Sequence, residues 1–111
     1  MTEPAPEAYP NQRVFERDDF TCCYCGAGGR DDFETWFTAH LGVDHIKPRK
    51  HGGTNDIGNL ATCCHACNVY KGSADCNSVD EARAYLRGRR ELAKQWFERH
   101  VRTSHNRAGS D

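Results

Sequence analysis

Two cysteine pairs constrain the fold of this chain more than any other feature of its sequence. Each pair has the spacing CxxC: Cys22 with Cys25, and Cys64 with Cys67. A CxxC turn places two thiolates side by side, and two such turns complete a tetrahedral sulfur site that suits Zn²⁺. A single CxxC is compatible with redox chemistry, but two of them without a thioredoxin-like βαβ pattern favour zinc. Four thiolates leave no open coordination position, so the predicted zinc ion is structural.

The composition explains why such a metal site is needed. The chain has 111 residues, of which 37% are hydrophobic, so burial of apolar side chains alone predicts a marginal fold. Domains of this kind usually recruit a metal ion or disulfides. An odd number of cysteines, seven, argues against a closed set of disulfides. The cysteines outside the two pairs are expected to be small buried side chains: Cys23, Cys63 and Cys76.

The sequence shows no secretory signal and no membrane span. Residues 1–10 are acidic and rich in proline and lack the apolar core of a secretory signal. No stretch approaches the roughly 20 apolar residues that a membrane helix needs. We therefore expect a cytoplasmic protein with reduced thiols and no membrane partner.

The net charge of −1 is unevenly distributed along the chain. Residues 1–34 carry eight acids and three bases, whereas residues 76–111 carry five acids and eight bases. Such a gradient is typical of an ordinary solvated surface. It is also compatible with a basic C-terminal half that faces phosphate. Charge alone leaves both interpretations open.

Local patterns predict a small α+β domain. Residues 11–17 and 68–71 are expected to form short helices, and residues 36–46 and 59–63 to form strands. Ser78 to Glu81 is a capping box that opens a longer helix, with a break at Gly88 as an open alternative. Its apolar positions have helical spacing and are expected to pack in the core: Ala82, Tyr85, Leu86, Ala93, Trp96, Phe97 and Val101. The predicted division is a flexible tail over 1–10, a core over 11–75, a helical extension over 76–102 and a flexible tail over 103–111.

The segment between the cysteine pairs carries the residues suited to chemistry. Thirty-eight residues separate Cys25 from Cys64, too many for a simple zinc ribbon. Asp44 and His45 are adjacent near the end of a predicted strand, so their side chains leave on different faces, one toward a metal ion and one toward water. The oxygens of Asp44 and Asn68 suit Mg²⁺ or Mn²⁺. Histidine suits a general base, because it titrates near neutral pH.

The order Asp44-His45, Asn59, Asn68, with a cysteine pair on each side, resembles the HNH endonuclease family from about residue 13 to residue 73. The resemblance implies a ββα-metal core stapled by a four-cysteine zinc site, with helices flanking it at both ends. It also implies metal-dependent hydrolysis of DNA phosphodiester bonds, by nicking or by double-strand cutting. In the implied roles Asp44 and Asn68 hold the catalytic ion, His45 is the general base and Asn59 orients the imidazole. The final motif position is Asn rather than His, which leaves the metal preference open.

Basic residues near the predicted base are expected to contact DNA phosphates: Lys47, Arg49, Lys50 and Lys71. The bases of the last predicted helix extend this surface: Arg83, Arg87, Arg89, Arg90 and Lys94. Such contacts hold the backbone without reading bases, so we expect weak sequence specificity for double-stranded DNA and an affinity that falls with salt. The alternative function is a non-catalytic zinc-binding module for nucleic acid or a protein partner. Zinc binding, however, requires none of the four motif residues. A monomer, a dimer and membership of a larger nucleic-acid-processing complex all stay open.

Overall fold

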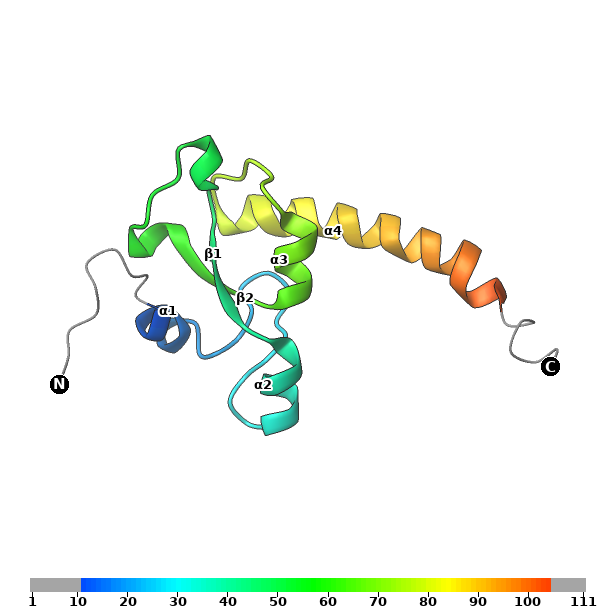
Figure 1. Ribbon diagram of the computed structural model, residues 1–111, viewed down its shortest axis with the longest axis horizontal. Helices are drawn as coiled ribbons and strands as arrows, with labels where there is room; N and C mark the ends of the chain where they lie inside the picture. Colours follow the sequence, from blue (N-terminus) through cyan, green and yellow to red (C-terminus); the bar gives the residue numbers. More distant parts are fainter. Residues whose placement is uncertain (1–10, 105–111) are drawn as a thin grey trace.

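The computed structural model describes residues 11–104. Figure 1 shows a small α+β body from which one long helix projects. Along the chain the main elements are α1 (Asn11–Arg17), α2 (Phe33–Ala39), β1 (Gly42–His45), β2 (Leu60–Cys63), α3 (His65–Lys71) and α4 (Val79–Trp96). Short helical turns η1 (Arg49–His51) and η2 (Ile57–Asn59) separate the strands, and η3 (Phe97–Val101) and η4 (Arg102–Ser104) follow α4.

The two strands form one antiparallel pair at the centre of the body. Asp44 lies opposite Ala61, and His45 lies opposite Leu60. All four residues of β2 are buried. Helix α1 packs against this strand, and the buried Thr62 hydroxyl donates to the carbonyl of Val14. Because α3 follows β2 almost directly, the centre has the ββα order, and the predicted α+β class is confirmed.

The prediction of a strand over residues 36–46 is wrong for its first half, which is helix α2. The Asp32 carboxylate caps this helix by accepting from the backbone N–H of Thr35 at 2.9 Å and from its hydroxyl at 2.6 Å. His40 ends the helix in the left-handed conformation, with φ 51°. A good cap at each end outweighs the β preference of the aromatic and β-branched residues between them. The strand itself begins only at Gly42.

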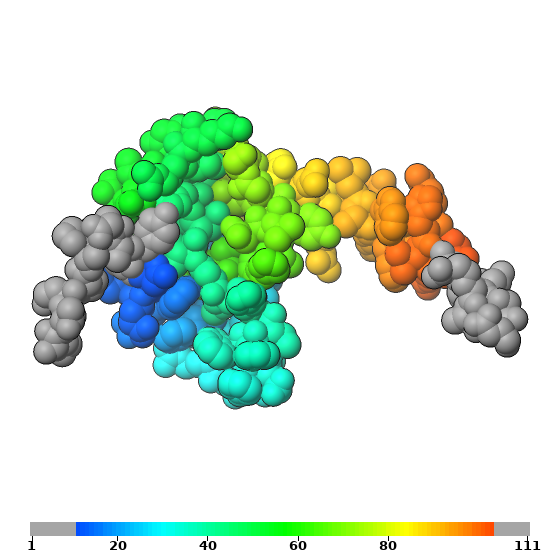
Figure 2. All heavy atoms as spheres, in the orientation of Figure 1, coloured from blue at the N-terminus to red at the C-terminus, as the bar shows by residue number. Residues whose placement is uncertain are grey.

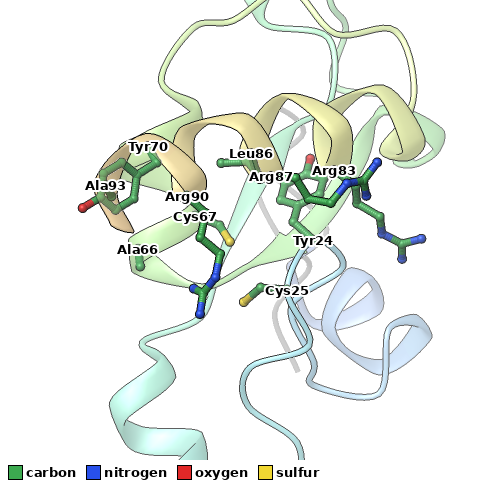
Figure 3. A pocket seen from close by; sticks show the side chains of 10 residues that line it. All are labelled: Tyr24, Cys25, Ala66, Cys67, Tyr70, Arg83, Leu86, Arg87, Arg90 and Ala93. Carbon is green, nitrogen blue, oxygen red and sulfur yellow. The ribbon is translucent and has the colours of Figure 1, made fainter. Parts of the chain in front are cut away.

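Helix α4 begins as predicted and then runs beyond the body. The Ser78 hydroxyl accepts from the N–H of Glu81, and the helix continues through Gly88 without a break. Ala82 is fully buried, but Trp96 and Val101 are 58% and 49% exposed. The prediction of core packing is therefore wrong for Tyr85, which is 40% exposed, and for the last residues of the apolar stripe. Between Arg83 and Ala93 this helix lines a groove that separates it from α3, shown in Figure 3, and its C-terminal end projects from the body in Figure 2.

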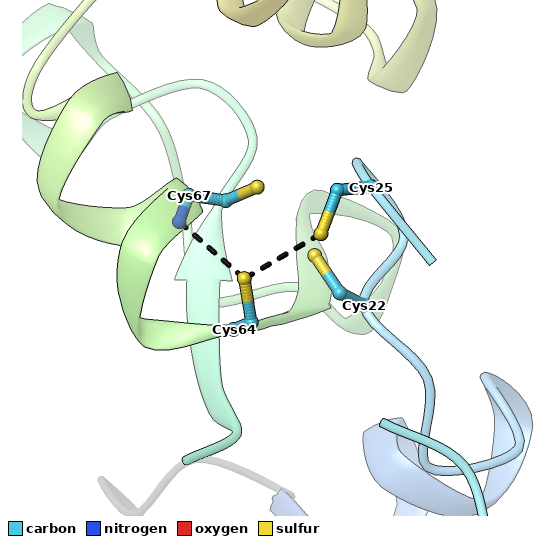
Figure 4. A group of neighbouring side chains, drawn as sticks. All are labelled: Cys22, Cys25, Cys64 and Cys67. Carbon is cyan, nitrogen blue, oxygen red and sulfur yellow. Dashed lines mark hydrogen bonds between the residues drawn. The ribbon is translucent and has the colours of Figure 1, made fainter. Parts of the chain in front are cut away.

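The four predicted zinc ligands form one cluster, drawn in Figure 4. The Sγ atoms of the two CxxC pairs all lie within 4.8 Å of one another. Cys64 also caps helix α3, since its Sγ accepts from the N–H of Cys67 at 3.4 Å. The cluster therefore joins the turn before α2 to the start of α3, and its four sulfurs are placed to hold a metal ion.

The thiols of the cluster differ in how easily they ionise. The neighbouring Cys63 thiol and nearby backbone N–H groups lower the pKa of Cys22 to about 4, although burial opposes this. Burial raises the pKa of Cys25 and of Cys67, and the charge of Cys22 adds to that effect. A cluster that resists full ionisation by itself loses its remaining protons when a metal ion binds.

The other cysteines lie outside the cluster. Cys63 and Cys76 are buried as predicted, and Cys23 is half-buried. The predicted tails cover residues 1–10 and 103–111. Thr103 and Ser104 belong to the helical turn η4, and the remainder of both tails falls outside the described residues. Within residues 11–104, no helix is long and apolar enough to cross a membrane.

We expect Cys64→Ser to lose its metal ion and to unfold under conditions in which the wild type is folded. Structural zinc in small finger peptides contributes on the order of 10–16 kcal/mol at pH 7, more than a small core supplies. Cys76→Ser is the control, because Cys76 is also buried but lies outside the cluster. It should keep its metal ion and lose about 1–3 kcal/mol. Metal content and thermal unfolding report both results, and a metal-free Cys64→Ser protein with the wild-type Tm would show that the cluster does not hold the fold together.

Candidate active site

A cavity of about 350 Å³ brings together three of the predicted catalytic residues, Asp44, His45 and Asn68. Asp44 and His45 come from β1, and Asn68 comes from the face of α3 that is turned toward this strand. Arg49 and Lys50, both exposed on η1, line the same cavity. The two predicted ion ligands therefore share one wall instead of lying on opposite sides of the molecule.

Asp44 is held by two buried donors. Its Oδ2 accepts from the Tyr24 hydroxyl at 2.7 Å and lies 3.0 Å from the Lys71 ammonium. The Lys71 side chain is 0% exposed, and its ammonium also donates to the carbonyl of His45 at 3.1 Å. The prediction that Lys71 contacts DNA phosphate is therefore wrong, because this charge is enclosed and paired. Lys71 instead ties the candidate ion ligand to the backbone of the candidate base.

Tyr24 is a site residue that sequence reasoning missed. Burial raises its pKa, and the adjacent negative charge of Asp44 raises it further. The phenol therefore stays protonated and acts as the donor in this hydrogen bond. In the sequence Tyr24 is only one of the two residues between Cys22 and Cys25. The structure shows that its hydroxyl reaches Asp44 on β1.

The imidazole of His45 meets a second residue that was not predicted. Its Nε2 lies 2.7 Å from Oδ1 of Asn55. The Asn59 side chain makes its three hydrogen bonds with the loop between the strands: it accepts from the N–H of Lys47 and donates to the carbonyls of Lys47 and Thr54. In this geometry Asn59 holds the loop from which Asn55 approaches the imidazole. Nothing in the spacing of the motif singles out Asn55.

The same loop requires a glycine where it turns back on itself. The N–H of Gly53 donates to the carbonyl of Pro48 at 2.9 Å. A Cβ at Gly53 would lie 1.6 Å from the carbonyl oxygen of Lys47, so no other residue fits there without moving the loop. This close approach fixes the segment that carries Arg49, Lys50 and Asn55.

The basic side chains around the cavity differ in whether their charges are paired within the protein. Lys47 pairs with Asp75 at 2.8 Å and also donates to Asn77, so its charge is partly satisfied within the protein. The exposed Arg49 and Lys50 are the cations best placed to meet an anion from solvent. The cavity thus combines oxygen ligands for a hard cation, an imidazole and two exposed basic side chains. This combination suits the chemistry of a phosphate ester.

Comparison with known protein families gave a match for the segment that holds the site. The family model described as HNH endonuclease matches residues 22–74. Searches of curated proteins and of solved structures found no match. The matched segment contains the four-cysteine cluster, both strands, helix α3 and the cavity residues. Residues 22–74, a little under half of the chain, are therefore similar to the HNH endonuclease domain, and their ββα order and four-cysteine cluster agree with that fold.

Proposed function

We propose that this protein is an endonuclease that hydrolyses DNA phosphodiester bonds with a divalent metal ion. The observation that carries the proposal is the shared cavity of Asp44, His45 and Asn68, with Arg49 and Lys50 at its edge. Each residue alone has an ordinary structural role open to it. Their convergence from β1, η1 and α3 on one cavity supports a common chemical role.

His45 is the proposed general base. An imidazole whose Nε2 hydrogen is donated to an amide oxygen presents Nδ1 as the proton acceptor. The contact with Asn55 supports this tautomer, and the loop held by Asn59 and Gly53 keeps Asn55 in place. The base then takes a proton from a water molecule as that water attacks phosphorus.

Asp44 and Asn68 are the proposed ligands of the catalytic ion. Their oxygens suit Mg²⁺ or Mn²⁺, and the donors on Oδ2 of Asp44 hold its carboxylate in one orientation. An ion bound there would stabilise the negative charge that develops on the phosphate. The ion of the four-cysteine cluster is proposed to be Zn²⁺, because tetrahedral sulfur ligation suits it.

The proposed substrate is double-stranded DNA bound with little sequence preference. Arg49 and Lys50 contact phosphates, which fixes the position of the backbone without reading bases. Because the affinity depends on these charges, it falls as the salt concentration rises.

We expect His45→Ala to reduce cleavage by about 10²–10⁴-fold, the usual contribution of a general base, while the metal content and Tm stay near wild type. A plasmid-nicking assay with Mg²⁺ and Mn²⁺ measures this. His100→Ala is the control, because His100 contacts the Trp96 ring in a tilted arrangement far along the chain from the cavity, so this variant should cut normally. If His45→Ala cut as fast as the wild type, His45 would not be the base. A wild type inactive with every ion would instead favour a non-catalytic module.

We expect Asp44→Asn to abolish ion-dependent cleavage and to destabilise the fold by about 3–5 kcal/mol, because it leaves the buried Lys71 ammonium without a carboxylate. Asp44→Asn/Lys71→Met removes both charges and should recover most of that stability without recovering cleavage. Thermal unfolding and nicking assays separate the two effects. Wild-type cleavage by the double variant would remove Asp44 from the catalytic site.

We expect Gly53→Ala to lower cleavage at least tenfold, because the added methyl group would displace the loop that carries Arg49, Lys50 and Asn55. Gly58→Ala is the matched control, since a Cβ at Gly58 meets no atom within 4 Å. The initial nicking rate of each variant measures the effect. Equal activity of the two variants would mean that the position of the loop is irrelevant to cleavage.

A further inference from the structure

A second hollow lies on the other side of α3 from the catalytic cavity. This groove, of about 630 Å³, runs between α3 and α4. Ala66 and Tyr70 of α3 line the groove, whereas Asn68 and Gly72 line the catalytic cavity. At 3.6 residues per turn Asn68 lies on the face of the helix opposite Ala66 and Tyr70, and Gly72 follows the end of the helix. Helix α3 therefore stands between two hollows.

The charged side chains that line the groove are all arginines. Arg83, Arg87 and Arg90 share one face of α4, because they are spaced by four and three residues. Figure 3 shows them leaving α4 on the side where Tyr24 and Cys25 lie. No carboxylate lines the groove, and α3 itself contains no acidic residue. The groove is thus lined by positive side chains with no carboxylate among them.

Two of these three arginines have no hydrogen-bond or ion-pair partner among the described residues. Arg83 donates to the carbonyl of Cys23 at 2.8 Å, which supports the first cysteine turn. Arg87 and Arg90 make no hydrogen bond or ion pair with any residue of the described range 11–104. Two exposed guanidinium groups one helical turn apart are free to bind an anion from solvent.

The simplest structural explanation is that the arginines offset the charge of the sulfur cluster. A divalent ion with four thiolates carries a net charge of −2, and Cys25 and Cys67 line the groove. The cluster, however, already has backbone donors: Cys22 Sγ accepts from the N–H of Tyr24, and Cys64 Sγ accepts from the N–H of Cys67. Two of its four sulfurs therefore have donors other than a guanidinium group.

We propose that this groove binds the phosphate backbone of duplex DNA, with α3 seated in a groove of the duplex. A helix with its side chains is about 10–12 Å across, and a groove of DNA that admits a helix has one phosphate strand along each edge. One strand then enters the catalytic cavity beside Arg49 and Lys50, and the other passes along Arg87 and Arg90. Guanidinium groups suit this contact, because they bind phosphate oxygens in pairs. The inference rests on the proposed function, since it takes DNA as the substrate.

The test compares two variants with the same loss of charge. Arg87→Ala/Arg90→Ala removes the free charges of the groove. The control, Arg13→Ala/Arg30→Ala, removes two exposed charges that do not line it. Binding of a short labelled DNA duplex is measured by fluorescence anisotropy over a range of salt concentrations, without added Mg²⁺ or Mn²⁺. For the groove variant we expect the slope of log affinity against log salt to become shallower by about 1.8, roughly 0.9 for each lost phosphate contact. The control should keep the wild-type slope.

The nicking assay gives a second, independent readout. In the groove variant KM should rise while kcat stays near wild type, because the catalytic cavity lies on the opposite face of α3. Equal salt slopes for the two variants would overturn the inference. So would a groove variant that loses its metal ion or lowers its Tm without any change in DNA binding, because the arginines would then serve the sulfur cluster.

Failure of the proposed nuclease function and failure of the groove assignment give different experimental results. If the wild type binds duplex with the expected dependence on Arg87 and Arg90 but cuts nothing, the groove stands and the catalytic proposal fails. If the wild type cuts and both variants bind as it does, only the groove assignment is wrong. If the wild type binds no DNA, both fail together.

Discussion

The arrangement of this domain depends on four sulfur atoms that lie within 4.8 Å of one another. They join two turns that are far apart in the sequence, and each turn then supplies a donor to the same carboxylate. Tyr24 lies between the first two ligands, and Lys71 lies one helical turn beyond the last ligand, Cys67. Both reach Asp44 on β1. The sulfur cluster therefore determines where α3 begins and, through these two side chains, how the candidate ion ligand is oriented.

The buried contacts of Tyr24 and Lys71 with Asp44 orient the carboxylate more than they stabilise the fold. A buried ion pair is a weak source of stability, because desolvation of both charges offsets their attraction. Here the ammonium contacts the carboxylate and, in addition, the carbonyl of His45. One buried charge thus links the ligand of the proposed ion with the residue proposed as the base, so that the two keep a constant relation to each other. A neutral core of the same volume would hold the fold but not this relation.

Helix α3 connects the site with the rest of the surface. One face carries Asn68 toward the strands, and the other carries Tyr70 toward the arginines of α4. Cys64 and Cys67 lie one turn apart at the start of α3, so their ligation leaves this helix little freedom to rotate about its axis. The same sulfur ligation therefore fixes the direction of both faces of α3. Beyond its first turns α4 has no comparable anchor within the described residues, and its later apolar side chains remain exposed.

The sequence by itself determined the features that depend on local spacing: the two cysteine turns, the cap of α4 at Ser78, the end of α3 near Gly72 and the adjacency of Asp44 and His45. These follow from neighbouring residues, and neighbours along the chain remain neighbours in the fold. Only the tertiary structure decided which side chains meet across the chain. It enclosed Lys71 at Asp44, brought Asn55 to His45 and left Trp96 outside the core. It also turned residues 33–39 into a helix, because two terminal caps outweighed strand propensity. The physical reason is the same in each case: burial and pairing depend on partners that lie far away in the sequence, and no local pattern of residues encodes their position.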